Sequence, residues 1–204
     1  MFIVCLDLEG VLTPEIWEEV AKATEINELM LTTRDVPDYD VLMKRRLDIL
    51  KDNQIALYDI QRIISRIELL SGALEFVNWL RSITQLVMIT GSFSEFTKPL
   101  MKKLGYPLVL CHSLETDNTG MIINYNLRIT DMKRKTVRSF KEMNYNVIAV
   151  GDSYNDLGML KEAEYGILFR PPMNIKKEYP QFPVVTEYSE LKKIISNYIE
   201  PKKQ

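Results

Sequence analysis

The chain has 204 residues, 46% of them hydrophobic and 26% charged, which is typical of a globular protein with a buried core. Its 26 basic and 28 acidic residues give a net charge of −2, so we expect no field strong enough to recruit nucleic acid. No apolar run approaches the length of a membrane span, and the first run is too short for a signal peptide. We therefore expect a cytoplasmic protein without a membrane partner, in which Cys5 and Cys111 are reduced and buried.

The first apolar run ends in a pair of acids. Residues 2–6 are apolar and partly β-branched, and Gly10 follows closely, which predicts a short buried strand. Asp7 and Glu9 stand at its carboxyl end, where open parallel sheets bind ligands. Carboxylates this close repel each other unless a cation or a shared proton relieves them. The pair therefore predicts a metal site.

The segment that follows, as far as Ser71, contains helical patterns and no convincing strand. Thr13 and Pro14 are typical of an N-cap and a first helical position. Pro37 predicts a loop over 34–38, because it disfavours helix at the residue before it. We predict an all-helical insertion after the first strand. Apolar residues recur at helical spacing in 16–24, 41–50 and 57–67.

From Gly72 onward, short apolar runs alternate with helical patterns. This alternation predicts an α/β fold, a doubly wound Rossmann-like parallel sheet with helices on both faces. The turn at 117–120 lies between two strand patterns and predicts a β-hairpin. The predicted strands are 86–89, 108–111, 121–127, 147–150, 165–169 and 183–185, and the predicted helices are 73–81, 95–104, 131–143, a helix after Tyr154, and 189–198.

Two later strands also end in polar residues. Thr90-Gly91-Ser92 follows the strand 86–89, and a cluster from Gly151 to Asp156 follows the strand 147–150. Each motif alone has a structural interpretation, as a turn cap, a helix start or an acidic N-cap, since short motifs often match by chance. Carboxyl ends of parallel strands meet at one edge of a sheet, so the three motifs together indicate one site.

These motifs, in this order, resemble those of the haloacid dehalogenase superfamily of phosphotransferases. The resemblance covers essentially the whole chain and implies a catalytic core of residues 1–14 and 72–204 with a small inserted helical cap of residues 15–71. Within the superfamily, the chain is most similar to the bifunctional phosphoserine phosphatase/homoserine phosphotransferase branch. The segments that carry this similarity are CLDLEGVLTPEIW, TTRDVPDYDVLMKRRL and GDSYNDLGML.

The resemblance implies a mechanism for the acidic residues. Asp7 would be the nucleophile that becomes an aspartyl-phosphate, and Glu9 the general acid and then the general base. Lys133 would offset the charge shared by the phosphate and Asp7. Mg²⁺ suits a site of oxygen ligands. It would be held by the side chains of Asp7 and Asp152 and the backbone carbonyl of Glu9, with Asp156 supporting the metal and the lysine.

The resemblance also implies residues that bind the substrate. Thr90 and the N–H of Gly91 would hold phosphoryl oxygens at a helix start, and Asn155 would contact the phosphoryl group or the substrate. Glu15 would bind the substrate ammonium and Arg46 its carboxylate. The expected reaction is Mg²⁺-dependent hydrolysis of phosphoserine, with homoserine as a second phosphoryl acceptor, and homodimer formation is left open.

Several of these residues have competing interpretations. Glu15 could simply be an acid in a first helical turn, stabilised by the helix dipole. Arg46 could lie on a solvated helix face, with Arg45 as its main competitor for the substrate carboxylate. The competitors of Lys133 are Arg134 and Lys135. Residues expected to be structural are His112, Trp17 and Trp79.

Two departures from the superfamily pattern stand out. Glu9 replaces the aspartate that most members have, although the bifunctional branch resembles this chain there. Ser92 stands where phosphoserine phosphatases typically have a second glycine. Two other functions stay open at this point, namely a phosphatase for another small phosphate monoester and a receiver-like signalling protein that is phosphorylated on aspartate.

Overall fold

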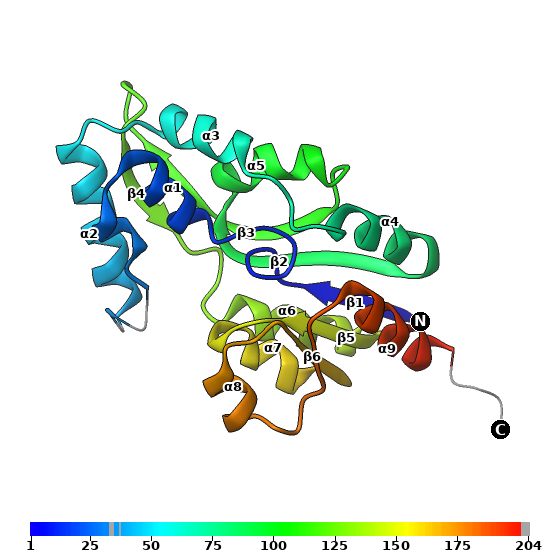
Figure 1. Cartoon of the computed structure of the whole chain (residues 1–204). Helices are drawn as coiled ribbons and strands as arrows, with labels where there is room; N and C mark the ends of the chain where they lie inside the picture. Colours follow the sequence, from blue (N-terminus) through cyan, green and yellow to red (C-terminus); the bar gives the residue numbers. More distant parts are fainter. Residues whose placement is uncertain (33–34, 37, 201–204) are drawn as a thin grey trace.

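The computed structural model describes residues 1–32, 35–36 and 38–200, so Arg34 and Pro37 of the predicted loop lie outside the described residues. The chain folds around a seven-stranded sheet of order β4-β3-β2-β1-β5-β6-β7 (Figure 1). Neighbouring strands are parallel except β3 and β4, which form the predicted hairpin. The strands are β1 (Phe2–Leu6), β2 (Gln85–Phe93), β3 (Leu108–Thr116), β4 (Ile122–Asn126), β5 (Asn146–Gly151), β6 (Tyr165–Phe169) and β7 (Val184–Val185).

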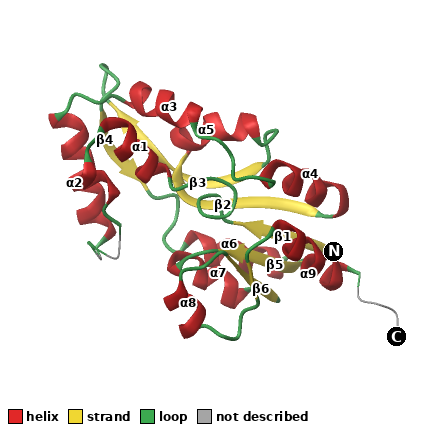
Figure 2. Cartoon of the chain, in the orientation of Figure 1, coloured by secondary structure: helices red, strands yellow, loops and turns green. Residues whose placement is uncertain are grey.

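Helices pack on both faces of this sheet, as Figure 2 shows. Alternate residues of a strand point to opposite faces, so Val4 and Leu6 join one apolar core and Ile3 and Cys5 join the other. The first core includes α4 (Ala73–Ile83), α5 (Ser94–Lys103) and α9 (Tyr188–Ile199). The second includes α6 (Met132–Glu142), α7 (Leu157–Glu162) and α8 (Met173–Glu178). The predicted doubly wound α/β fold is confirmed.

Helices connected by loops form the insertion between β1 and α4, and its described residues contribute no strand to the sheet. It contains α1 (Ile16–Thr24), a 3-10 helix η1 (Asn27–Met30), α2 (Tyr39–Asp52) and α3 (Leu57–Arg66). The hairpin braces it from outside, since the Tyr125 hydroxyl donates to Asp40 at 2.7 Å and the Leu57 N–H donates to the Gly120 carbonyl. The exact cap boundaries, 15 and 71, stay a prediction.

A proline inside α5 ties the insertion to the core. Pro99 has no N–H, so it leaves the carbonyl of Glu95, one helical turn earlier, without its usual donor. Gln61 of α3 supplies the replacement, with its side-chain amide 2.9 Å from that carbonyl. An interior proline that would weaken an isolated helix thus becomes an attachment point between α3 and α5.

The predicted N-cap at Thr13 is wrong. Thr13 pairs with Glu9 in an isolated β-bridge, and α1 begins three residues later at Ile16. The first N–H of α1 is bonded to the Glu9 carboxylate at 2.9 Å. The Glu9 side chain, in the loop after β1, therefore accepts the helix N–H bond that was predicted for Thr13.

Two further differences concern helix positions. Asp131 precedes α6 as predicted, but its backbone is left-handed and its carboxylate pairs with Arg134 rather than capping the helix. The short helix α8 follows Pro171 and Pro172 and was not predicted, because six residues are too few to show a helical period.

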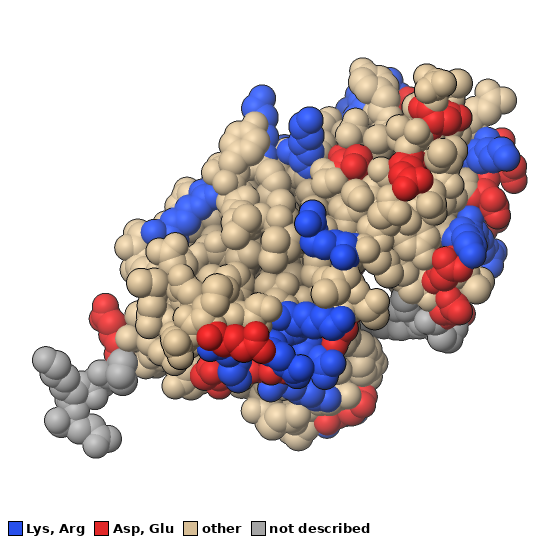
Figure 3. Space-filling model, turned by 180° about the vertical axis from the view of Figure 1, so that it is seen from behind, with Lys and Arg blue, Asp and Glu red and all other residues tan. Residues whose placement is uncertain are grey.

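Surface charges of both signs are mixed. Figure 3 shows basic and acidic side chains beside each other on one face, and the structure pairs Arg134 with Asp131 and Arg138 with Glu162. This arrangement agrees with the small net charge. Within the described ranges, no helix is long and apolar enough to cross a membrane.

Candidate active site

A cleft of about 290 Å³ lies at the carboxyl ends of β1, β2 and β5. The strand order reverses at β1, which has β2 on one side and β5 on the other, and such a switch point is where open α/β sheets bind ligands. The sheet contributes one wall and the insertion the other. The predicted site residues that line the cleft are Asp7, Glu9, Glu15, Arg46, Thr90, Gly91 and Asn155.

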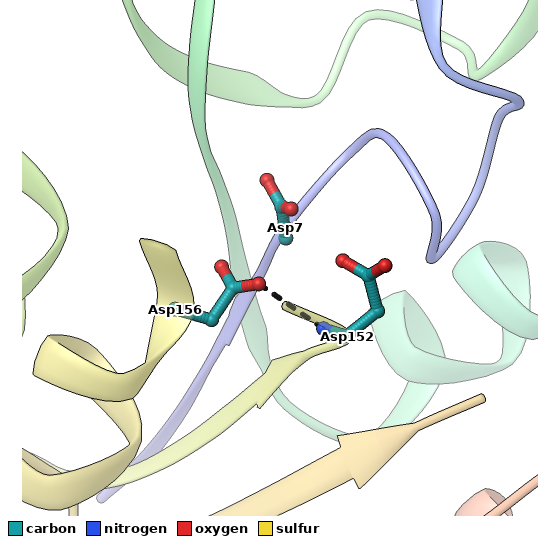
Figure 4. Close-up of side chains that lie close together, drawn as sticks. All are labelled: Asp7, Asp152 and Asp156. Carbon is teal, nitrogen blue, oxygen red and sulfur yellow. Dashed lines mark hydrogen bonds between the residues drawn. The ribbon is translucent and has the colours of Figure 1, made fainter. Parts of the chain in front are cut away.

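Three aspartates meet at Asp7, which is the one of them that lines the cleft (Figure 4). Asp7 follows β1, Asp152 follows β5, and Asp156 lies in the next turn, with carboxylate oxygens within 4.8 Å of one another. Lys133 is 7% exposed and lies 2.8 Å from Asp7 and 2.6 Å from Asp156. Arg134 is instead bonded to Asp131 on the surface. Lys135 is exposed. Of the three basic residues, Lys133 is the one that the structure brings to the acids.

Both carboxylate oxygens of Asp156 already accept hydrogen bonds from the protein. One carboxylate oxygen accepts from the backbone N–H groups of Asp152 and Ser153, and the other accepts from Lys133. A Cβ on Gly151 would lie 2.3 Å from the Asp156 carboxyl carbon, so this close approach requires glycine. The bonding favours Asp156 as a residue that positions Lys133 and the loop after β5.

Asp152, in contrast, has an unfilled bonding capacity. Among the described residues, no group donates to its buried Oδ1. Burial, followed by the charge of Asp156, raises the pKa of Asp152 to about 7. The same two causes raise the pKa of Asp7 well above its ordinary value, although Lys133 opposes them. An orphaned carboxylate oxygen beside a second carboxylate fits a hard cation such as Mg²⁺.

Glu9 lies between the cleft and the insertion. Its carboxylate accepts the Ile16 N–H, and the Ser92 hydroxyl also bonds to it. Burial raises the pKa of Glu9, while these two hydrogen bonds oppose the rise. The acid is therefore fixed at the junction of β1, β2 and α1, and its protonated form is favoured relative to a free glutamate.

The Thr90-Gly91-Ser92 motif is not at a helix start, which corrects the prediction. β2 continues through Phe93 and α5 begins at Ser94, with the pairing of β2 and β3 irregular between Ile89 and Phe93. The Thr90 hydroxyl accepts the Ser92 N–H at 3.1 Å. A Cβ at Gly91 would meet no atom within 4 Å. The backbone at Gly91 thus borders open space in the cleft.

The insertion brings a buried cation to the other side of the cleft. Arg46 is 6% exposed, donates to the Leu31 carbonyl at 2.7 Å and lies over the Trp17 ring at 4.4 Å. Arg45 is exposed and does not line the cleft. Glu15 is an exposed residue at the cleft mouth, where partial burial of its carboxyl and then the Glu9 charge raise its pKa.

Of the remaining residues discussed from the sequence, Asn155 and Trp17 lie at the cleft, whereas His112 and Trp79 have structural contacts. Asn155 lines the cleft and accepts from Lys133 at 3.0 Å. His112 accepts the Arg128 N–H, which is a structural role as expected. Trp79 stacks on Phe76. Trp17, expected in the core, contributes to the cleft wall and carries Arg46 on its face.

Tyr39 and Ser92 are among the cleft residues that sequence reasoning missed. Tyr39 is the first residue of α2 and lines the cleft. A helical period alone could not show this, because the face of α2 that meets the core motifs depends on how the insertion packs. Ser92 could have been found from the sequence, because it stands where phosphoserine phosphatases typically have a second glycine.

A family model for haloacid dehalogenase-like hydrolases matches residues 3–164. The chain belongs to this family. Phosphoserine phosphatase of Pseudomonas syringae pv. tomato is 54% identical over 191 residues, covering 94% of this chain and 81% of that protein. Phosphoserine phosphatase ThrH of Pseudomonas aeruginosa is 53% identical over 193 residues, covering 95% and 94%.

Solved structures support the fold of this hydrolase. Phosphoserine phosphatase from T. onnurineus superposes with a TM-score of 0.74 at 24% identity, covering 96% of this chain and 94% of that one. At that identity the likeness bears on the fold alone. Membership of a hydrolase family disfavours the receiver-like alternative, and the roles of the individual site residues stay predictions.

Proposed function

We propose that the chain is a Mg²⁺-dependent phosphoserine phosphatase that acts through an aspartyl-phosphate on Asp7. The observation that carries this proposal is that the two walls of one cleft offer different groups. The sheet wall holds Asp7 beside a buried lysine, and the insertion wall holds the buried guanidinium of Arg46 and the carboxylate of Glu15. A phosphate monoester of an amino acid matches both walls, and two relatives more than half identical are phosphoserine phosphatases by name.

The residues divide the reaction into two displacements. The Asp7 carboxylate attacks phosphorus, the bond to the serine oxygen breaks, and Glu9 gives its proton to that oxygen. Glu9 then takes a proton from water, which attacks phosphorus and releases inorganic phosphate and Asp7. Lys133 offsets the negative charge around Asp7 throughout. Mg²⁺, held by Asp7, Asp152 and the Glu9 carbonyl, would supply further charge neutralisation when bound.

Homoserine is our second proposed phosphoryl acceptor. Its ammonium and carboxylate are the groups that serine has, so Glu15 and Arg46 could hold either amino acid. Water and the homoserine hydroxyl would compete for one phospho-enzyme, and Glu9 would be the base for both. The cytoplasm, as the site of amino-acid metabolism, is the proposed location.

A panel of small phosphate monoesters tests this function directly. Phosphate release should be fastest with phosphoserine, should require Mg²⁺, and should decrease when homoserine is added, with phosphohomoserine appearing in its place. Faster release from a monoester that has no amino-acid group would favour the other phosphatase hypothesis instead.

Replacing Arg46 with Ala should reduce phosphoserine hydrolysis selectively. Loss of a hydrogen bond to a charged group costs about 1.5–3 kcal/mol, or about one to two decades in kcat/KM. Phosphoethanolamine has no carboxylate and should be much less affected. Arg45→Ala is the matched control, because Arg45 is exposed outside the cleft. An equal loss with both substrates would remove Arg46 from the carboxylate site.

Mg²⁺ should stabilise the fold more at pH 8 than at pH 5.5. Asp152 has a pKa of about 7 in the metal-free fold and about 3.9 unfolded, so the fold binds the proton more tightly. Stability of the metal-free protein therefore falls as the pH rises from about 4 to 7, and the loss is complete above that range. Above pH 7, bound Mg²⁺ would neutralise the Asp152 carboxylate, as the proton does at lower pH.

The measurement is the melting temperature with Mg²⁺ or with EDTA at each pH. Ligand at about 100 Kd contributes about 2.7 kcal/mol, which corresponds to an increase of about 5–10 °C for a chain of this size. Asp152→Asn should abolish the increase. An equal increase at both pH values would show that Asp152 is not linked to the metal.

A further inference from the structure

Arg46 offers only part of its guanidinium to a ligand. One terminal nitrogen donates to the Leu31 carbonyl at 2.7 Å, and Trp17 covers one flat face. Its Nε is buried and has no partner among the described residues. The other terminal nitrogen lies 3.8 Å from the Met43 sulfur. A carboxylate has more acceptor positions than the remaining donors satisfy, so a complete carboxylate site needs another donor.

Tyr39 places an unused donor in the cleft that Arg46 also lines. It is half-buried and lines the same cleft, and its hydroxyl makes no hydrogen bond with any described residue, nor is it sealed from solvent. Burial raises the pKa of Tyr39 to about 12, with Arg46 and then Glu9 as the charged groups that act on it. The phenol is therefore protonated and can donate near neutral pH.

The β3–β4 hairpin holds the Tyr39 ring in place. The ring of Tyr125 on β4 meets it edge-to-face, with ring centres 5.8 Å apart and planes at 88°. The Tyr125 hydroxyl is bonded to Asp40, the next residue of α2. Asp38 caps the helix by accepting the N–H groups of Asp40 and Val41. These contacts hold the ring in place before any ligand binds, which lowers the cost of using its hydroxyl.

We propose that Tyr39 is a specificity-determining residue whose hydroxyl donates a hydrogen bond to the carboxylate of the amino-acid ligand, next to Arg46. The inference rests on the proposed function. The phosphoryl group belongs beside Asp7 and Lys133, and the ammonium belongs with Glu15. The carboxylate is the remaining anionic group, and Arg46 is the charged group that brings it to Tyr39.

Tyr39→Phe tests this inference, because it removes the hydroxyl and keeps the ring that packs on Tyr125. The kcat/KM for phosphoserine should fall about 10- to 100-fold, as expected for a lost hydrogen bond to a charged group, while that for phosphoethanolamine should change less than about twofold. Tyr58→Phe is the matched control. Tyr58 lies in the same insertion, is 71% exposed and is outside the cleft, so both values should be unchanged. In an Arg46→Ala background, the Tyr39→Phe effect should shrink, because the two donors share one ligand group.

Two results would overturn the role of Tyr39. One is an equal loss with both substrates, and the other is an unchanged value for phosphoserine, including a case in which only transfer to homoserine falls. Failure of the proposed function itself is seen earlier, in the unmodified protein. If that protein does not prefer phosphoserine to phosphoethanolamine, both proposals are overturned before any variant is compared.

Discussion

Replacement of Asp7 by Asn is expected to abolish turnover of every phosphate monoester and to leave the protein folded. The amide is a poor nucleophile, so no phospho-enzyme forms. Removal of a catalytic nucleophile reduces kcat by about 10⁶-fold in well-studied hydrolases. Asparagine keeps the shape of aspartate, and Lys133 retains its bonds to Asp156 and Asn155. Steady-state phosphate release, with thermal unfolding as the test of folding, measures the effect.

A matched control separates loss of the nucleophile from loss of charge. Asp117 accepts three hydrogen bonds at the hairpin turn and does not line the cleft. Asp117→Asn makes the same chemical change and should leave kcat within about twofold. Activity in the Asp7 variant above a few per cent would contradict an aspartyl-phosphate on Asp7.

The sequence predicted the sheet and the edge at which the cleft lies, for a physical reason. Strands of a parallel sheet are covered on both faces, so they appear as short continuous apolar runs. Their carboxyl ends then mark one edge, which is why Asp7, Thr90 and Asp152 could be assigned to one site before any geometry was known. In the structure, Asp7 and Asp152 follow adjacent strands.

Local rules failed where contacts between secondary-structure elements decided where an element begins or ends. Thr13 has the chemistry of an N-cap, but the Glu9 carboxylate bonds to the first N–H of α1 instead. The motif at Thr90 looked like a helix start, but β2 extends to Phe93 because pairing with β3 resumes at His112. Both outcomes depend on packing between elements, which a local pattern does not contain.

The choice between Arg45 and Arg46 needed three-dimensional information. Adjacent residues of a helix point about 100° apart, so only one of them can face the cleft. Which one it is depends on the orientation of α2, and that orientation is held by the hairpin through Tyr125 and Asp40. The same contact brings Tyr39 to the cleft, which explains why no pattern in the sequence indicated it.

Glu9→Gln should slow phospho-enzyme formation in a way that depends on the leaving group. Serine leaves as an alkoxide unless it receives a proton, so removal of the acid should slow its departure about 10²–10⁴-fold. Glutamine keeps the length of the side chain, and its carbonyl can still accept the Ile16 N–H that Glu9 accepts. The start of α1 should therefore keep its position.

A substrate with a good leaving group provides the comparison. p-Nitrophenyl phosphate needs little protonation at its leaving oxygen, so the variant should phosphorylate Asp7 from it with much less loss. The informative measurement is the single-turnover rate of phospho-enzyme formation from each substrate, in the variant and in the unmodified protein. Steady-state rates are less informative, because dephosphorylation by water or homoserine also needs Glu9 as its base.

The two substrates distinguish a proton donor from a residue that only positions the cap. If Glu9 donates the proton, the ratio of the phosphoserine rate to the p-nitrophenyl phosphate rate should fall by about two to four decades in the variant. If Glu9 acts only by holding α1 through Ile16, both rates should fall together, since both substrates react in the same cleft. An unchanged ratio would therefore assign Glu9 to the positioning of α1 and leave the proton of the serine leaving group to another source.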